Sequence, residues 1–466
     1  MVVVMKFGGS SVADGERIAN VAKLVRNQPG DKVVVVSAMG GVTDSLIQIA
    51  TSVVDLPSSV VEREVDNFCR ELSVKQRKAI MVAVPNKRIR GAVLSKSLEL
   101  IDKLRVALLG VGYLEDLSLR SMDYILSFGE RLNAQVVSAA LKSARVPSDP
   151  LTGSEAGLVT DSCFGRARPL HSKSKKLVSK RLMEMIKGGK VPVVTGFIAT
   201  DEKDRITTLG RGGSDYTASL IGKYLKAKEV QIWTDVDGIL STDPRIVPDA
   251  KLIPTLSYSE AMDLAYYGAK VIHSKMIEPA MVSRIPVRVK NTFNPNIEGT
   301  LIVSKQKKVK HVIKAVAIAK DVVIVNLEGV GMVETPNIAG QLFSVLGEGN
   351  INIVMISGSS ESNLSFVIAE SDLKHALTLL GENLCNEVNK AISIIKDVSI
   401  VTVVGTGMRG SKGIAARVFN TVADIGVNII MIAQGSSELN IAFVVNSADI
   451  PKTVSAVHGR FIDHDA

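Results

Sequence analysis

Aromatic residues are scarce in this chain of 466 residues, at 4% of the composition. The two densest basic stretches, 166–181 and 305–310, contain almost no aromatic side chains on which bases could stack. The net charge of +9 is spread along the chain. No nucleic-acid partner is therefore expected, and the basic residues are interpreted as solvated helix faces or as approach routes for anionic substrates.

Cysteine and histidine are also few. The three cysteines, Cys69, Cys163 and Cys385, form no C-x-x-C pair, and the six histidines form no cluster with metal-ligand spacing. A disulfide framework and a structural zinc site are thus not expected, and a reducing compartment, the cytoplasm, fits best. No apolar run approaches the ~20 residues of a membrane span. The apolar residues 1–7 are too short for a signal peptide and are interpreted as a buried strand.

What is present is an ordinary globular mixture, with 46% hydrophobic and 22% charged residues, long enough for roughly two to four domains. Short apolar runs alternate with amphipathic segments up to about residue 303, which predicts an α/β fold with a parallel or mixed sheet covered by helices. One helix is predicted around 18–25 after an Asp14 cap, and another over 214–225. The predicted strands are 1–7, 32–37, 191–197, 229–236 and 286–293.

After residue 311 the chain repeats itself at an interval of 76 residues. The segment 314–325 returns as 390–401, and Asn352-Ile353 returns as Asn428-Ile429. The second copy gains one residue, at Ala433-Gln434. Two copies predict a tandem pair of small α+β domains, at 312–386 and 387–466, with exchange of a strand between them possible.

The first motif with chemical meaning is Lys6-Phe-Gly8-Gly9-Ser10-Ser11, between a strand and a helix. Paired glycines allow backbone amides to approach an oxyanion, and Lys6 adds a mobile positive charge. The motif lacks the spacing of a Walker loop. It predicts a phosphate cradle, with a plain strand-to-helix turn as the alternative.

A second glycine-rich turn, 209–215, carries Arg211 and Asp215 at the start of a helix. A guanidinium beside free amides suits an anion, and a carboxylate can orient neighbouring cations. The alternative is a capped turn without function. Because two such turns occur in one α/β domain, one is suited to the phosphates of a nucleotide and the other to its acceptor.

Further candidates follow other apolar runs: Thr43 in the segment 37–44, Glu130 in 127–131, and the polar residues of 233–245. Ligands of open α/β sheets bind beyond the carboxyl ends of the strands. Taken singly, the first two segments are better explained by ordinary capping, and a simple turn explains the third equally well. The segment 405–410 imitates a dinucleotide fingerprint, but its repeat partner lacks the third glycine. His273 is interpreted as structural.

Taken in order, these motifs resemble those of the aspartate kinases of the amino-acid kinase family, and the repeats resemble ACT regulatory domains. The resemblance implies a three-layer α/β/α kinase domain over 1–303 with a mainly parallel sheet, followed by two ferredoxin-like ACT domains. The segments that carry it read KFGGSS, SAMGGVTD, SFGERLNAQ, GRGGSDYTAS, WTDVDGI followed by DPR, and YYGAKVIHSK.

The family implies transfer of the γ-phosphoryl group of ATP, with Mg²⁺ bridging phosphate oxygens, to the side-chain carboxylate of L-aspartate. The product, 4-phospho-L-aspartate, begins the lysine, threonine and methionine pathway. By resemblance, Lys6 neutralises the phosphoryl charge, Gly8 and Gly9 cradle it, and Asp215 organises the transfer. No protein ligand of Mg²⁺ can be assigned. Alternatives are a kinase of this fold acting on another amino acid, such as glutamate, and a non-catalytic amino-acid sensor.

The same resemblance implies that Arg211 binds the α-carboxylate of aspartate and Glu130 its α-ammonium, with Thr43 and Ser214 also at the substrate. Two departures from the family occur: Ser10 replaces a usual threonine, which keeps the hydroxyl, and Leu240 replaces a tyrosine of some members, which puts ring stacking on the nucleotide in doubt. The nucleotide positions carried over besides the cradle are Ser10, Thr234, Asp235, Leu240, Arg245, Lys270 and Val271.

The ACT resemblance implies feedback inhibition by an end-product amino acid bound between paired modules, in a homodimer or a dimer of dimers. Val354 stands where some lysine-sensing relatives have an acidic residue, so threonine is favoured over lysine. Because the chain ends at Ala466, a monofunctional kinase without a fused homoserine dehydrogenase is expected. The expected effector positions are Met332, Asn337, Ile338, Ala339, Asn350, Asn352 and Gln434.

Overall fold

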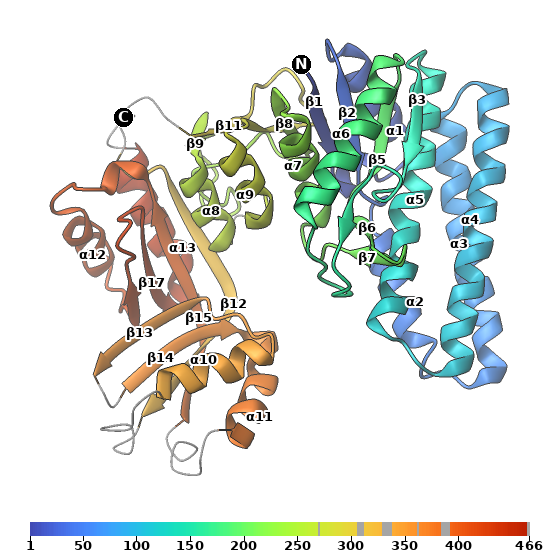
Figure 1. Ribbon diagram of the computed structural model, residues 1–466. Helices are drawn as coiled ribbons and strands as arrows, with labels where there is room; N and C mark the ends of the chain where they lie inside the picture. Colours follow the sequence, from blue (N-terminus) through green and yellow to red (C-terminus); the bar gives the residue numbers. More distant parts are fainter. Residues whose placement is uncertain (269–270, 305–311, 329–337, 361–362, 384–391, 464–466) are drawn as a thin grey trace. The chain divides into compact units, whose positions relative to one another are not determined.

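The structure is a computed structural model that describes residues 1–268, 271–304, 312–328, 338–360, 363–383 and 392–463 (Figure 1). Its contacts divide the chain into two compact units. The first consists of Met1–Ile239, Pro254–Tyr258 and Val271–Lys305, and the second of Leu240–Ile253, Ser259–Lys270 and Gln306–Ala466.

An eight-stranded sheet forms the centre of the first unit, in the order β3-β5-β2-β1-β8-β10-β11-β9. β1 lies between β2 and β8 and is parallel to both, and the antiparallel pair in this sheet is β10 with β11. The valine-rich strands are buried because helices cover both faces of the sheet. The strands are β1 (Val3–Phe7), β2 (Lys32–Val36), β3 (Ser148–Leu151), β5 (Val191–Thr195), β8 (Glu229–Thr234), β9 (Thr255–Ser257), β10 (Val287–Asn291) and β11 (Thr300–Val303).

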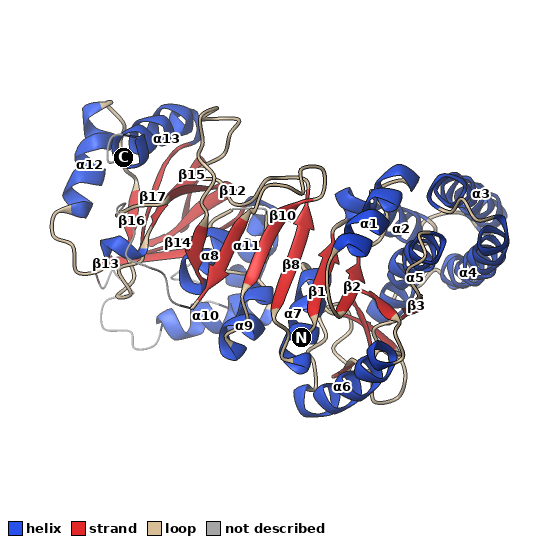
Figure 2. Ribbon diagram, turned by 90° about the horizontal axis from the view of Figure 1, so that it is seen from above, coloured by secondary structure: helices blue, strands red, loops and turns tan. Residues whose placement is uncertain are grey.

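Helices lie on both sides of this sheet, so the unit has three layers (Figure 2). α1 and α5 pack on one face, whereas α6, α7 and α9 pack on the other. The Asp14 carboxylate accepts a hydrogen bond from Arg17 N at the start of α1, as the sequence predicts. The bounds are α1 (Gly15–Asn27), α2 (Val42–Ser52), α3 (Ser58–Ala83), α4 (Lys87–Leu114), α5 (Leu119–Ser143), α6 (His171–Lys187), α7 (Gly213–Leu225), α8 (Tyr258–Tyr266) and α9 (Ser274–Ser283).

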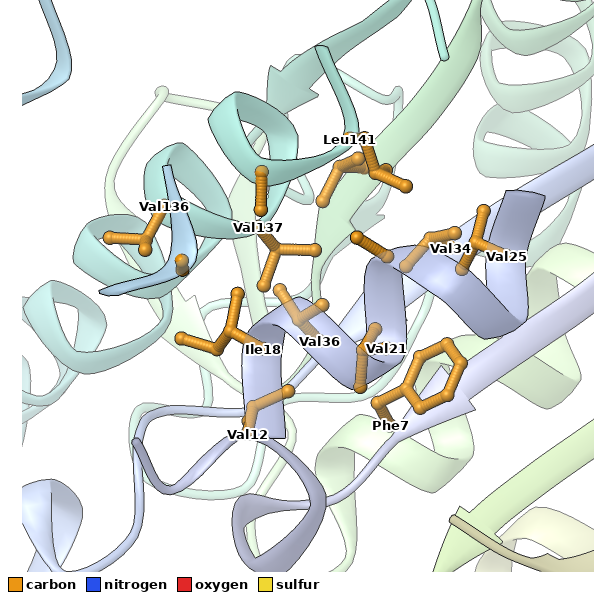
Figure 3. Packing of buried hydrophobic residues seen from close by; sticks show 14 of the residues in the cluster. Phe7, Val12, Ile18, Val21, Val25, Val34, Val36, Val136, Val137 and Leu141 are labelled. Carbon is orange, nitrogen blue, oxygen red and sulfur yellow. The ribbon is translucent and has the colours of Figure 1, made fainter. Parts of the chain in front are cut away.

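The core under α1 and α5 comes from alternate residues of the strands. Phe7 and Val36 point into this layer, together with Val21 of α1 and Val137 of α5 (Figure 3). Because side chains alternate along a strand, Lys6 points to the opposite face, toward α7. A small sheet of β4 (Val159–Thr160), β6 (Ile198–Asp201) and β7 (Ile206–Thr208) leads into α7.

The second unit contains one six-stranded sheet, in the order β13-β14-β12-β15-β17-β16, built by both copies of the repeat. Each copy supplies three strands, and the first strands of the two copies, β12 and β15, pair antiparallel. The elements are β12 (Ala315–Glu328), α10 (Ile338–Glu348), β13 (Met355–Ser360), β14 (Asn363–Ala369), α11 (Leu373–Asn383), β15 (Ile392–Val404), α12 (Ile414–Asp424), β16 (Met431–Ala433), β17 (Asn440–Asn446) and α13 (Ile450–His458).

The repeated Lys-Asp dipeptide has a structural meaning. Asp321 and Asp397 occupy equivalent places and both have positive φ, 58° and 56°. The pairing of β12 with β15 shifts its register at this point, which is the behaviour of a β-bulge. Val316, before the bulge, packs in the core of the second copy, whereas Val323, after it, packs in that of the first. The first strand of the first copy, β12, thus contributes side chains to the cores of both copies.

Two segments that precede residue 303 pack within the second unit. Ser241 Oγ lies 2.8 Å from Nε2 of the buried His458. Glu260 of α8 forms a buried ion pair with Lys314 at 3.0 Å. The compact units therefore interleave along the chain. None of the described helices combines the length and the low charge needed to cross a lipid bilayer.

Candidate active site

Three neighbouring strands end together and bring three of the predicted segments to one edge of the sheet. In the register, Phe7 lies beside both Val36 and Trp233. The next residues along the chain, Gly8 after β1, Ser37 after β2 and Thr234 at the end of β8, are therefore neighbours at the carboxyl edge. Ligands bind at this edge in open α/β sheets.

Lys6 and Asp215 meet at this edge. The Lys6 ammonium lies 2.5 Å from Oδ1 of Asp215, and both side chains are largely buried, with 10% and 14% exposed. Lys6 comes from β1 and Asp215 from the first turn of α7, the helix that packs on that face of β1. Two residues 209 positions apart thus form one charged pair beside the glycine turn.

The turn after β1 is held close to the Lys6 amine. A Cβ at Gly8 would lie 3.3 Å from Lys6 Nζ, and a Cβ at Gly9 would lie 3.5 Å from a backbone oxygen of the turn after β2. Ser11 fixes the following segment, because its hydroxyl lies 2.6 Å from Thr292 Oγ1 and 3.2 Å from the carbonyl oxygen of Trp233. Glycine at both positions therefore keeps the backbone beside the Lys6 amine free of side chains.

Glu130 of α5 reaches the turn after β2. Its Oε1 accepts a hydrogen bond from Ala38 N at 3.1 Å, and Asn133 Nδ2 donates to Ser37 O at 2.6 Å. Oε2 of Glu130 is buried and has no partner among the described residues. Burial raises the pKa of Glu130 to about 8, although the Ala38 amide and the charge of Lys6 act in the opposite direction. A cationic ligand group at Oε2 would restore the ionised carboxylate.

The turn that carries Arg211 requires glycine at positions 210 and 212. Gly210 and Gly212 have φ of +72° and +73°, a region that other residues rarely adopt. A Cβ at Gly212 would lie 2.4 Å from the ring of His273. The His273 side chain also accepts a hydrogen bond from Lys275 N and caps α9, in agreement with its structural interpretation. Arg211 itself is exposed.

Other predicted substrate and nucleotide residues also belong to the first unit. Ser214 packs against the turn after β5, where a Cβ at Gly196 would lie 2.6 Å from its hydroxyl. Thr43 is half-buried in the first turn of α2. The Thr234 hydroxyl donates to the exposed Asp235 at 3.0 Å.

The structure does not bring every predicted nucleotide residue into this group. Leu240 and Arg245 belong to the second compact unit, where the exposed Arg245 pairs with Asp243 at 2.7 Å. Val271 lies at the start of the last segment of the first unit. Lys270 lies outside the described residues.

The predicted effector positions are described in part. Met332 and Asn337 lie outside the described residues. Ile338 and Ala339 begin α10, and Asn350 has a positive φ of 57° in the turn after that helix. The remaining two are exposed: Asn352, whose side chain bonds Tyr266, and Gln434, which lines a cavity of about 640 Å³ at the start of α12.

One buried carboxylate of α5 was not predicted from the sequence. Asp123 of α5 is 1% exposed and accepts hydrogen bonds from Gly165 and Thr208. Its partners lie 42 and 85 residues away, so no local motif marks it. The seven-residue spacing from Glu130, two helical turns, was the available signal.

Within the described part of the chain, no three His, Cys, Asp or Glu side chains are grouped so as to hold a metal ion. Neither Gly8 nor Gly9 carries a side chain that would occupy the space beside the Lys6 amine.

Comparison with known proteins gives concordant results. The amino acid kinase family model matches residues 1–291, and an ACT domain model matches 325–384 and 401–461. Aspartokinase 1 of Arabidopsis thaliana is 34% identical over 468 residues, which cover 99% of this chain and 80% of that protein. A bifunctional aspartokinase/homoserine dehydrogenase of Haemophilus influenzae is 32% identical over 98% of this chain and 56% of its own length.

Solved structures show the same similarity. E. coli aspartokinase III in complex with aspartate and ADP superposes with a TM-score of 0.85 at 28% identity, covering 98% of this chain and 99% of that chain. The same E. coli enzyme in complex with lysine and aspartate gives a TM-score of 0.81 at 28% identity, covering 99% of each chain. The predicted fold class, three α/β/α layers followed by paired ACT modules, is confirmed.

Proposed function

This chain belongs to the aspartokinases of the amino acid kinase family, and from that premise we propose that it transfers the γ-phosphoryl group of ATP to the side-chain carboxylate of L-aspartate. The observation that carries the proposal is the ion pair of Lys6 with Asp215 beside the backbone of Gly8 and Gly9. It provides one positive charge and a set of amides where a phosphoryl group would sit.

The reaction requires the protein mainly to position the reactants and to stabilise negative charge. An oxygen of the ionised aspartate side chain forms the new bond to phosphorus, the bond from phosphorus to the β-phosphate oxygen breaks, and ADP leaves with that electron pair. No general base is needed, because the attacking carboxylate is already ionised at neutral pH. Lys6 stabilises the charge on the transferring group, and Asp215 holds Lys6 in place. Mg²⁺ supplies further neutralisation when it is bound with the nucleotide.

Recognition of aspartate rests on opposite charges at two places. Oε2 of Glu130, which is buried and without a partner in the described chain, suits the α-ammonium of an amino acid. The exposed guanidinium of Arg211 suits its α-carboxylate, and Ser214 and Thr43 are proposed as further substrate contacts. ATP would meet the cradle with Ser10, Thr234, Asp235 and Val271, and Leu240, Arg245 and Lys270 are proposed to contact it by resemblance.

The experiment is a comparison of acceptors. Purified full-length protein is assayed for ADP release with aspartate and with glutamate, and the acyl phosphate is trapped with hydroxylamine. Aspartate-dependent ADP release with hydroxamate formation is expected. Glutamate preferred by orders of magnitude would support the related kinase instead. ATP turnover absent with every amino acid, despite tight binding of one of them, would identify a non-catalytic sensor.

We further propose regulation by an end-product amino acid at the ACT modules of a cytoplasmic homodimer or dimer of dimers. Threonine is favoured over lysine because the apolar Val354 cannot pair with a lysine ammonium. Gln434 offers an amide to a ligand in the cavity of the second copy. Inhibition assays with threonine, lysine and methionine test the effector preference. Light scattering measures the oligomeric state. Loss of threonine inhibition in Gln434→Ala would support it, and inhibition by lysine alone would overturn it.

A further inference from the structure

α5 buries two carboxylates on the side that faces the active site. Glu130 is one of them, and Asp123, seven residues earlier, lies on the same helical face two turns away. Asp123 is 1% exposed. The substrate contacts proposed above give it no role.

The Asp123 carboxylate joins two segments that are distant in sequence. Its Oδ2 accepts hydrogen bonds from Gly165 N at 2.9 Å and from Thr208 N at 3.0 Å. Its Oδ1 accepts one from Thr208 Oγ1 at 2.6 Å. Burial raises the pKa of Asp123, whereas these three hydrogen bonds lower it. A single side chain thus accepts hydrogen bonds from the buried amide of Thr208 and the half-buried amide of Gly165.

Both segments lie against the turn that carries Arg211. Thr208 ends β7 three residues before Arg211, and its carbonyl oxygen accepts a hydrogen bond from Ala167 N at 2.8 Å. A Cβ at Gly210 would lie 3.2 Å from the carbonyl oxygen of Gly165. The beginning and one side of the turn are therefore set by the two residues that Asp123 holds.

We propose that Asp123 is a positioning residue for aspartate binding: by holding Thr208 to Gly165 it fixes the turn at 210–212 and directs the Arg211 guanidinium toward the substrate. The inference rests on the proposed function. Its physical basis is precision, since a displacement of ~1 Å in a binding group can reduce turnover about a hundredfold even when the change lies outside the chemistry.

The hydrogen-bond geometry also predicts which replacement of Asp123 preserves its positioning role. In Asp123→Asn the amide oxygen can accept from both backbone amides, and the amide nitrogen can donate to Thr208 Oγ1, which then acts as the acceptor. In Asp123→Ala the two amides and the hydroxyl lose their partner in a buried place. Acceptor geometry, rather than charge, is the feature that Asp123 supplies.

Steady-state kinetics of the full-length protein test the inference. Asp123→Ala is expected to raise the KM for aspartate about tenfold or more while the KM for ATP stays within about threefold, and Asp123→Asn to restore most of the affinity. A lower melting temperature with an unchanged KM for aspartate would reduce Asp123 to a structural role and overturn the inference.

A second pair of variants covers the case in which Asp123→Ala does not fold. Thr208→Val removes only the hydroxyl that bonds Oδ1, and Thr208→Ser keeps it. We expect a raised KM for aspartate in the valine variant and recovery in the serine variant; equal values in both would overturn the inference. Wild-type protein without aspartate-dependent turnover would instead refute the proposed function. Hydrogen exchange at the amides of 209–213 then decides the positioning role independently, with faster exchange in Thr208→Val than in Thr208→Ser supporting it and equal exchange overturning it.

Discussion

Glu130 accepts a hydrogen bond from the backbone amide of Ala38 across 92 residues of sequence, and it does so with only one of its two carboxylate oxygens. The other oxygen is buried without a partner among the described residues. One side chain of α5 therefore shapes the turn after β2 and also presents a site for a ligand cation. The two roles depend on the same protonation state, because only the ionised carboxylate neutralises an ammonium group.

The first prediction concerns the pH dependence of aspartate use. Burial raises the pKa of Glu130 to about 8, so the free enzyme at pH 7 holds this carboxyl mainly protonated. We expect kcat/KM for aspartate to rise between pH 7 and 9, with a midpoint near pH 8, in initial-rate measurements. Glu130→Gln should lower kcat/KM and flatten this rise. A wild-type profile without an inflection in that range would contradict the assignment.

The same raised pKa makes a prediction about stability. The unfolded carboxyl titrates near 4.3, so between about pH 4.5 and 8 the folded state binds more protons than the unfolded state. Stability from Glu130 is therefore fully present below the unfolded pKa and is lost as the pH rises through the folded value. In urea unfolding, the free energy of unfolding of the wild type minus that of Glu130→Gln should decrease as the pH rises through this window. Saturating aspartate should reduce the decline, because its ammonium stabilises the ionised carboxylate.

Removal of the Lys6 ammonium is expected to abolish most of the catalytic rate. In Lys6→Ala, kcat should fall by about three orders of magnitude, which is the size of loss seen when one preorganised charge contact is removed from a reacting oxyanion. Circular dichroism should show a retained fold. The double variant Lys6→Ala with Asp215→Asn is the control for the buried carboxylate that the single change leaves alone. Turnover near the wild-type value in Lys6→Ala would remove the phosphate cradle from the mechanism.

Much of the first sheet could be predicted because its signals are local. The five predicted strands appear as β1, β2, β5, β8 and β10, shortened by one to two residues at some ends. The meeting of Lys6 with Asp215 was expected from the family resemblance and not from strand order, because Asp215 lies in α7, which follows β7 of the small sheet.

Other features depend on contacts that leave no local pattern. Asp123 reads in sequence as a polar residue near a helix start, and its partners are known only once β7 and the segment around Gly165 are folded against α5. Likewise, Leu240 and Arg245 follow a strand of the first sheet, yet they pack within the second unit. Periodicity reports which face of an element is buried, but not which distant element covers it.

Two glycines with nearly the same φ allow the cost of backbone strain to be distinguished from the cost of a steric clash. Gly30 and Gly212 have φ of +75° and +73°. A Cβ added at Gly212 would lie 2.4 Å from the His273 ring, whereas a Cβ added at Gly30 would have nothing within 4 Å. Gly30→Ala should cost about 1–2 kcal/mol of stability with unchanged kinetics. Gly212→Ala should in addition raise the KM for aspartate, because the turn that carries Arg211 must move. Equal kinetics in the two variants would show that this turn does not position the substrate.

The buried ion pair between Glu260 and Lys314 should matter more when it is broken than when it is replaced. Its atoms lie 3.0 Å apart with side chains that are 0% and 5% exposed, and Oε1 of Glu260 also accepts a hydrogen bond from Thr406 N at 2.8 Å. Glu260→Ala removes the carboxylate that neutralises the buried Lys314 ammonium, so a loss of about 3–5 kcal/mol is expected. Replacing both partners by methionine should recover part of that loss, because the desolvation cost of both charges disappears. Urea unfolding of the two variants measures the difference. A double variant less stable than Glu260→Ala would mean that the pair itself, rather than the isolated charge, dominates the energy at this position.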